Sequence, residues 1–294
     1  MAWQHYRLVF RLLSPLHIGY RRTGNLMETR RYVPGKNLWA ALTARLVRNA
    51  GHGADGGAYR EVGRAVHKHF RFGYLWPSLD RENPYFPWKN DDFDYLFLGS
   101  AASTALEHSR RAAQDGTLHD VEFIAPTTRT GDEVYLLGDL WVQDPLPSVV
   151  AGWQDALRAF ALGGEQGYGW GRVRLEQDPQ PPMGNNSIGG FAWHVDGQEI
   201  VLTAPADSRI TAHAVAAGEQ AVTNVEGVVE PLVGWERQES GGYRLTQNVV
   251  VAYAPGATVG EETTVSIGCY GIYKDDVIPG DDPFGPAGHP RVIL

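Results

Sequence analysis

Ala161-Leu-Gly-Gly-Glu-Gln-Gly-Tyr-Gly-Trp-Gly-Arg-Val-Arg174 is the stretch of sequence from which both the fold and the function are best inferred. Five of the nine residues 163–171 are glycine. A turn from a helix into a strand needs only one or two glycines. The others indicate backbone that approaches a bulky partner closely and exposes N–H groups to it. Tyr168 and Trp170 lie between the glycines and two arginines follow, a combination that suits a nucleic-acid backbone. The alternative is an ordinary helix end.

The composition predicts a globular protein with a large core. The chain has 294 residues, of which 43% are hydrophobic and nine are tryptophan. The first residues lack the apolar run of a signal peptide, and no window approaches eighteen uninterrupted apolar residues. The single cysteine, Cys269, excludes an internal disulfide and argues against a cysteine-based zinc site. We therefore expect a cytoplasmic protein without a membrane partner, a metal or a cofactor.

The charge of the chain is unevenly distributed. The formal net charge is -8, but residues 1–48 carry nine basic residues against one acid, Glu28, which is +8 locally. After Asp178 the chain has five basic and fourteen acidic residues, or -9. A basic N-terminal region can hold phosphates, while the acidic remainder limits non-specific binding. The alternative is that these arginines are scattered over a solvated surface.

Hydrophobic periodicity predicts an α+β fold in which the first domain has the order βαββαβ. This is the order of the ferredoxin-like (RRM-like) fold, with a long insertion at about 58–118 between the first helix and the second strand. Asn37 is a candidate cap for the first helix. The turn at 130–132 predicts that the second and third strands form a hairpin. We expect strands at 6–13, 118–124, 133–142 and 170–175, and helices at 36–48 and 148–162.

A second domain follows a linker that is rich in proline and glycine. The linker covers 177–186, so the predicted domains are 1–178 and 187–294. The second domain is predicted to be mainly β, or a degraded second ferredoxin-like copy, with weak helical periodicity apart from 208–220. Strands are expected at 199–203, 222–229, 248–253 and 263–273.

Four segments, in this order, resemble the RAMP superfamily, the RNA-binding proteins of CRISPR effector complexes. Leu13-Ser-Pro-Leu-His-Ile-Gly19 is similar to the family's first strand and turn, and Tyr32-Val-Pro-Gly-Lys-Asn-Leu-Trp-Ala-Ala-Leu42 to its entry into the first helix. His108-Ser-Arg-Arg-Ala-Ala-Gln-Asp-Gly-Thr-Leu-His119 is similar to the segment before the second strand. The loop 163–171 resembles the signature glycine loop. Each motif alone is weak, but their order agrees with the βαββαβ prediction over residues 6–176.

The second domain carries a shorter resemblance. Leu232-Val-Gly-Trp235 and the run 249–259 are similar to a segment of the two-domain subunits that cap the 5′ handle of crRNA in type III complexes. Gly256-Ala257 stands where the family has Gly-Ser, which puts the subunit identity in doubt. The resemblance implies an RNA-binding role in antiviral defence. The implied partners are crRNA, backbone RAMP subunits, a large polymerase-like subunit that could dock on the insertion, and, indirectly, target nucleic acid.

We expect RNA contacts at the resembling motifs. Arg21, Arg22, Lys36 and Arg172 are candidates for phosphates, the glycine-loop amides for close backbone approach, and Tyr168 or Trp170 for base stacking. For Trp170 the alternative is a place in the core. Arg110 and Arg111 either line the same groove or end an exposed helix. The aromatic residues of 74–95 form the core of the insertion or a subunit interface. The full predicted set is His17, Arg21, Arg22, Lys36, Asn37, Arg110, Arg111, Gly163, Gly164, Gln166, Gly167, Tyr168, Gly169, Trp170, Arg172 and Trp235.

Catalysis is not expected. Slicing backbone subunits of this superfamily use an Asp in the loop before the Pro-Gly motif, whereas the loop 20–32 contains only Glu28. We interpret Glu28 as a salt-bridge partner of the surrounding arginines. His17 is the candidate general base if the protein is instead a metal-independent endoribonuclease that processes crRNA. The other alternative is a backbone subunit that cleaves target RNA.

Overall fold

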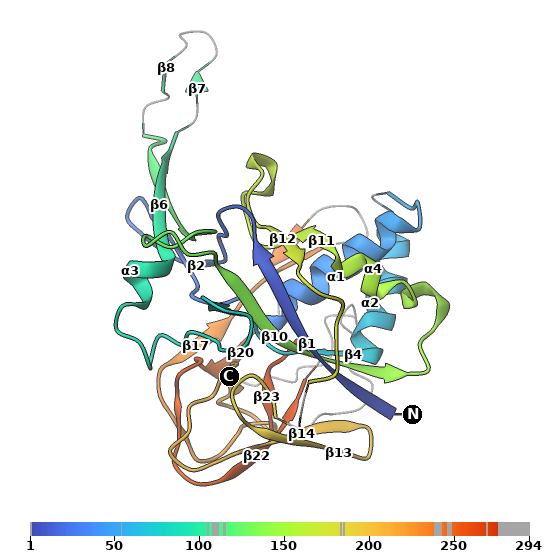
Figure 1. Ribbon diagram of the computed structural model, residues 1–294. Helices are drawn as coiled ribbons and strands as arrows, with labels where there is room; N and C mark the ends of the chain where they lie inside the picture. The colour runs from blue at the N-terminus through green and yellow to red at the C-terminus, as the bar shows by residue number, and fades with distance from the viewer. Residues whose placement is uncertain are drawn as a thin grey trace.

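The computed structural model describes residues 2–53, 55–104, 106–107, 112–113, 116–182, 184, 186–237, 243–245, 249–268 and 270–275. The fold is α+β, with strands in several sheets and few helices (Figure 1). The helices are α1 (Gly35–Asn49), α2 (Gly56–His69), α3 (Phe93–Phe97) and α4 (Trp153–Leu157), with 3-10 turns η1 (Ser148–Val150) and η2 (Gln166–Tyr168).

A central sheet organises the N-terminal half, with the order β11-β12-β1-β10-β4. β1 pairs along ten residues with β10, and β5 pairs with the other edge of β10. Nearly all of β10 is buried, which requires partners on both of its edges. The strands are β1 (Ala2–Leu12), β4 (Phe70–Phe72), β5 (Trp76–Ser78), β10 (Tyr135–Asp144), β11 (Ala159–Ala161) and β12 (Arg172–Leu175).

A second sheet, which contains β2, β3, β9 and β6 in that order, lies beside the first. β9 and β6 form a long antiparallel ribbon that projects from the body and leads to the short pair β7 and β8 (Figure 1). The strands are β2 (Gly19–Thr23), β3 (Leu26–Thr29), β6 (Leu98–Ser103), β7 (Leu106–Glu107), β8 (Ala112–Ala113) and β9 (His119–Ile124).

The C-terminal half is built of strands, as expected. Its main sheet has the order β13-β14-β22-β23-β15-β20-β17, with smaller pairs β16 with β21 and β18 with β19. The strands are β13 (Ala192–Asp196), β14 (Glu199–Ala204), β15 (Ala214–Val215), β16 (Val225–Glu226), β17 (Val229–Leu232), β18 (Trp235–Arg237), β19 (Tyr243–Leu245), β20 (Val250–Tyr253), β21 (Thr258–Val259), β22 (Thr263–Ile267) and β23 (Tyr273–Lys274).

The predicted hairpin between 118–124 and 133–142 does not form. Among the described strands, β9 pairs with β3 and β6, whereas β10 pairs with β1, β4 and β5. Residues 70–78, which we assigned to the insertion, supply β4 and β5 to the central sheet. Strands of three residues are too short for an alternating pattern to be visible in the sequence, which is why they were missed.

Three local expectations also differ from the structure. The segment 148–162 forms η1, the short α4 and strand β11, because Phe160 turns to pack on Phe10 while Ala159–Ala161 pairs with β12. The segment 208–220 contains no helix but the short strand β15. Pro34 stands at the N-cap of α1 without a side-chain hydrogen bond, so Asn37 is not the cap.

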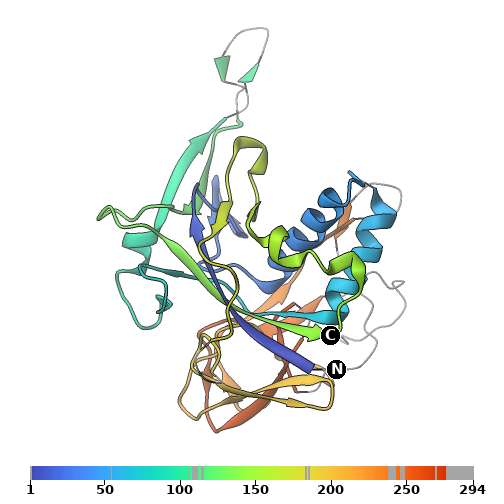
Figure 2. The same ribbon diagram turned by 45° about the vertical axis from the view of Figure 1, so that its right-hand side comes forward.

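The two faces of the central sheet are covered by different layers. Leu8, Phe10 and Leu12 of β1 pack in a core with α1, α2 and α4. Trp3 and Trp141 belong to another core, shared with Ile200, Leu202 and other residues of the C-terminal half. Figures 1 and 2 show the helices on one side and the C-terminal half on the other. Trp76, Phe86 and Trp88, from the aromatic segment 74–95, pack into this shared core.

Candidate nucleic-acid interface

The glycine loop 163–171 is fastened to the turn that follows β1. The Gly164 N–H donates to the His17 carbonyl at 2.9 Å, and the Gly171 N–H donates to the Pro15 carbonyl at 2.7 Å. Gly163 and Gly171 have φ of 73° and 74°. A Cβ on Gly163 would overlap the His17 carbonyl oxygen, and one on Gly171 the Leu162 carbonyl oxygen. These two glycines are therefore required by the close crossing of two backbones.

The expectation that the loop amides are free for a ligand needs correction at two positions. The N–H groups of Gly164 and Gly171 are used inside the chain, and the Gly169 N–H donates to the Gln166 carbonyl at 3.0 Å. The Gln166 side-chain amide donates to the Gly163 carbonyl at 2.9 Å, which closes the loop on itself. Gly167 has open space where a Cβ would be. The loop is thus a rigid projection more than a cradle of amides.

The two aromatic residues of the loop have different environments. Tyr168 is 80% exposed at the tip. Trp170 is half-buried, with its ring edge-to-face on Phe123 of β9 at a centroid distance of 5.2 Å. Trp170 therefore joins the glycine loop to the projecting ribbon, and Tyr168 is the ring that is available for a base. Phe123 was not among the predicted residues, because nothing in a strand pattern says which loop it meets.

His17 is buried beneath the glycine loop. Its Nδ1 lies 2.7 Å from the Glu122 carbonyl oxygen, which can only accept, so Nδ1 carries the proton and donates. The next residue, Ile18, donates its N–H to Thr29 Oγ1 at 2.9 Å. His17 thus holds the turn 14–17 against β9, which is a supporting role for the loop geometry.

The arginines at 21 and 22 lie on β2, every residue of which is exposed. Arg21 Nε pairs with Glu28 Oε2 at 2.7 Å, and Arg22 Nε donates to the Gly24 carbonyl at 2.9 Å. Hydrogen bonds from Thr23 and Arg21 lower the pKa of Glu28, so this carboxyl stays ionised. The interpretation of Glu28 as an ion-pair partner agrees with this geometry.

Arg30 and Arg31 are held more tightly than Arg21. Arg31 makes a bidentate pair with Asp94 through Nε and Nη2. Arg30 is largely buried and donates to Glu230 and to the Tyr32 hydroxyl. These two arginines connect the loop 20–32 to α3 and to the C-terminal half, which identifies them as structural residues.

The other predicted residues are distributed over different places. The Arg172 N–H donates to Ser14 Oγ at 2.8 Å, and its exposed side chain lies beside Gly169 in the glycine loop. Lys36 Nζ lies 5.6 Å from the ring centroid of Tyr270, and Lys36 approaches Gly234, so its contacts are with the C-terminal half. Arg110, Arg111 and the side chain of Trp235 lie outside the described residues.

The structure therefore brings together part of the predicted set. His17, the glycine loop and Arg172 meet at the turn 14–17, with β2 continuing from that turn (Figure 2). Within the part of the chain that the structure describes, no three His, Cys, Asp or Glu side chains gather as metal ligands. No helix of the described residues is long and apolar enough to cross a membrane.

No protein-family model matches the chain, and no curated protein matches its sequence. Among solved structures it is similar to a chain of the Type III-B Cmr-beta complex in the apo state, with TM-score 0.39 and 10% identity over 59% of this chain and 96% of that one. For the complex bound to cognate target RNA the values are 0.39, 11%, 58% and 96%. For the complex bound to cognate target RNA and AMPPnP, state 1, they are 0.49, 13%, 86% and 85%. The chain is thus structurally similar to subunits of a type III CRISPR effector complex.

Proposed function

We propose that this protein is a non-catalytic, RNA-binding subunit of a type III-like CRISPR ribonucleoprotein in the cytoplasm. It binds the 5′ handle of crRNA and nucleates the filament of backbone subunits in antiviral defence. The proposal rests on the four sequence segments that resemble the RAMP superfamily. It is supported by the fastening of two of these segments, 13–19 and 163–171, to each other.

We also infer that the central sheet is ferredoxin-like. If β4 and β5 are counted together as the second strand, then β12, β1, β10 and β4 are the fourth, first, third and second strands of a βαββαβ unit. α1 and α2 precede the second strand, and α4 precedes the fourth. On this interpretation the true insertion begins after β5, and it contributes the sheet that carries the projecting ribbon.

The observation that carries the RNA-binding proposal is the exposed tip of the glycine loop. Tyr168 stands clear of the body beside the exposed Arg172, and the loop behind it is rigid because Gly163 and Gly171 cross the turn 14–17. A rigid, exposed ring with a neighbouring cation binds a base by stacking and a phosphate by charge. Little conformational entropy is lost on binding because the platform is already ordered.

β2 extends this surface with phosphate contacts. The exposed pair between Arg21 and Glu28 contributes only about 0–1 kcal/mol, so Arg21 can exchange the carboxylate for a phosphate at little cost. Arg22 has a backbone carbonyl as its partner and keeps donors for a ligand. Arg31, with its bidentate carboxylate, is harder to redirect. The phosphate contacts are therefore assigned to Arg21, Arg22 and Arg172.

A non-catalytic role is consistent with the acid and base candidates. His17 Nδ1 donates to a backbone carbonyl beneath the loop, and the lowered pKa of Glu28 leaves it without a proton to transfer. The direct test uses the purified protein with a precursor RNA that contains repeats. We expect binding without cleavage. Cleavage that His17→Ala abolishes would establish the processing endoribonuclease instead.

The handle is tested in the complete complex. The protein is purified with the products of neighbouring genes, the bound RNA is sequenced, and crosslinks are mapped to residues at nucleotide resolution. We expect one small RNA with a repeat-derived 5′ end, crosslinked within 14–36 or 163–174. Crosslinks outside both ranges would contradict the proposed site, and target cleavage that survives in a complex whose known slicing subunits are inactivated would point to a backbone subunit.

A further inference from the structure

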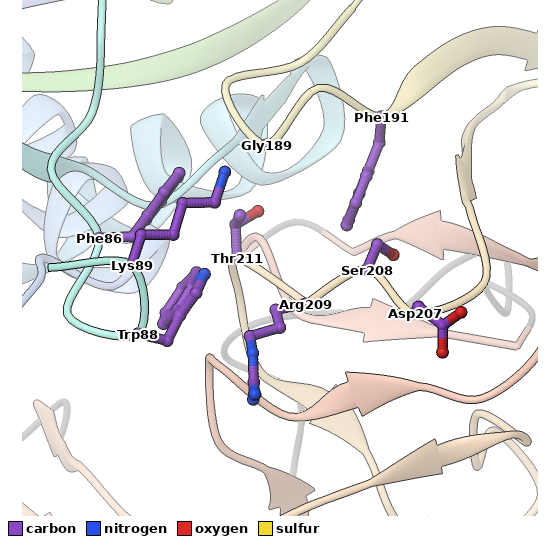
Figure 3. A pocket seen from close by; sticks show the side chains of 9 residues that line it. All are labelled: Phe86, Trp88, Lys89, Gly189, Phe191, Asp207, Ser208, Arg209 and Thr211. Atoms are coloured by element: carbon purple, nitrogen blue, oxygen red, sulfur yellow. The ribbon is translucent and has the colours of Figure 1, made fainter.

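A cavity of about 320 Å³ lies between the two halves of the molecule, apart from the glycine loop (Figure 3). Three segments converge on it: the loop after β5, the chain just before β13, and the loop after β14. This volume is at the lower end of the range for small-molecule sites. The lining residues that carry the inference are Phe86, Trp88, Lys89, Phe191, Asp207 and Arg209.

The walls of the cavity are preformed. The loop 207–211 runs antiparallel to 256–259, with Val259 N–H donating to the Ser208 carbonyl at 2.9 Å and Ile210 N–H donating to the Ala257 carbonyl at 3.0 Å. On the opposite wall, Phe86 and Trp88 stack at a centroid distance of 4.7 Å with an interplanar angle of 10°. Phe191 is buried. A ligand would meet an apolar wall that is ordered before binding.

Two cations stand at the exposed rim of this apolar wall. Lys89 Nζ lies 5.5 Å from the Phe86 ring centroid, and Arg209 Nη1 donates to the Gly256 carbonyl at 2.7 Å. Within the described residues, neither cation has a carboxylate within ion-pair distance, although Asp207 lines the same cavity. In Figure 3 the Asp207 carboxylate and the Arg209 guanidinium point in different directions.

The position of Arg209 is unusual for this part of the chain. Only five basic residues follow Asp178, against fourteen acids. In a half of this charge, a guanidinium would gain most by pairing with one of the many carboxylates. Arg209 instead uses one of its five N–H donors on a backbone carbonyl and keeps the others at the mouth of the cavity. The arrangement suits an anionic ligand.

We propose that this cavity binds one nucleoside phosphate. The phosphate contacts Lys89 and Arg209, and the base lies against the apolar wall formed by Phe86, Trp88 and Phe191. An apolar wall alone would take any hydrophobic group and the two cations alone any anion; their combination in a volume of this size selects a ligand with a planar ring and a phosphate. A free mononucleotide and one nucleotide of an RNA strand offer the same chemistry.

The test measures binding to the full-length protein by isothermal titration calorimetry with three probes. The probes are AMP, inorganic phosphate and a ten-nucleotide single-stranded RNA. The pocket variant is Lys89→Ala with Arg209→Ala. The matched control is Arg48→Ala with Lys68→Ala, which removes one Arg and one Lys from exposed positions of α1 and α2. Thermal melting verifies that both variants are folded.

We expect the pocket variant to bind AMP at least about tenfold more weakly than the wild type, and the control to bind it equally well. Trp88→Leu should weaken AMP binding but leave phosphate binding unchanged. A parallel loss for the RNA would assign the site to a nucleotide within RNA, and an unchanged RNA affinity would assign it to a free nucleotide. Absence of AMP binding to the wild type, an unchanged affinity in the pocket variant, or equal affinity for AMP and phosphate overturns the proposal. None of these outcomes depends on the proposed crRNA role, since the AMP measurement contains no RNA.

Discussion

At the scale of single residues, the glycines of the loop 163–171 have different functions that their spacing does not reveal. Gly163 and Gly171 are needed because their positive φ and missing Cβ let the loop cross the turn 14–17. Gly167 has neither a positive φ nor a neighbour within reach of a Cβ. The first two are therefore structural, whereas Gly167 is free to serve ligand approach alone.

Gly171→Ala should destabilise the protein by more than about 1 kcal/mol, because the new Cβ overlaps the Leu162 carbonyl oxygen at a positive φ. Gly167→Ala is the matched control and should leave the stability unchanged or slightly higher. Urea unfolding followed by tryptophan fluorescence measures both. Equal stability of the two variants would show that the crossing relaxes without cost.

Tyr168→Ala should weaken binding of handle RNA by about 1–3 kcal/mol, which is the contribution of stacking one base on an aromatic ring. Because Tyr168 is 80% exposed, the substitution should not alter the unfolding free energy. Fluorescence anisotropy with labelled RNA gives the affinity. Tyr95→Ala removes another exposed tyrosine, away from the loop, and should bind as the wild type does. An unchanged affinity in Tyr168→Ala would remove the stacking role.

At the scale of elements, β2 shows why a count of arginines overestimates a phosphate-binding surface. The loop 20–32 contains four arginines, but Arg30 and Arg31 are committed to Glu230 and Asp94. Arg21 and Arg22 remain on an exposed strand with weak partners. Burial and pairing, and not composition, decide which cations can reach an RNA.

Replacing both Arg21 and Arg22 by Ala should weaken RNA binding regardless of sequence and reduce the slope of log K against log salt by at most about two. Each arginine that contacts a phosphate contributes roughly one unit to that slope. The measurement is a salt titration of RNA affinity from low to moderate ionic strength, with Arg48→Ala plus Lys68→Ala as the charge-matched control. An identical slope in the Arg21 and Arg22 variant would contradict the assignment.

The segment 58–118 also changes meaning at this scale. β4 and β5 pair with β10, and Phe70 and Phe72 are fully buried against the helices. Excision of the whole segment would remove both strands from the sheet and leave β10 with one unpaired edge. A docking role for a large polymerase-like subunit therefore has to be sought in the part after β5, which carries the projecting ribbon.

At the scale of the whole molecule, a buried polar network connects the two halves. Glu230 accepts from Arg30 and from His213, and the Tyr74 hydroxyl donates to His213 Nδ1 at 2.6 Å. Tyr32 also faces this histidine. In this arrangement the neutral imidazole is satisfied on both nitrogens, whereas a second ring proton would meet the Tyr74 hydroxyl. Burial accordingly lowers the pKa of His213, and the pKa of Glu230 is lowered by His213 and Arg30 despite the opposing effect of burial.

Both shifts make the protein less stable in acid. A group whose pKa is lower in the folded state binds protons preferentially when unfolded, so stability is lost as the pH falls below the ordinary values of 6.5 for the histidine and 4.5 for the glutamate. We expect the unfolding free energy to fall between pH 7.5 and 5.5, and to fall less in His213→Gln. Urea denaturation at several pH values measures it. The same pH slope in wild type and variant would contradict the role of His213.

The sequence by itself determined the elements whose signal is local. The apolar stripe of α1 and the continuous hydrophobic run of β1 are visible without the structure, and so is the strand-rich C-terminal half. The resemblance of 13–19 and 163–171 to known motifs also needed no coordinates. Spacing, turn residues and composition act over a few residues, so they survive in the linear chain.

Only the tertiary structure decided which elements meet. β4 and β5 replace β9 beside β10, Phe160 leaves the predicted helix for the sheet, and Trp170 rests on Phe123. The cavity between Trp88 and Arg209 joins residues from both halves. Such pairings depend on burial summed over many long-range contacts, and each contact involves residues far apart in the chain. No local pattern encodes that sum, and therefore the site emerges only when the chain is folded.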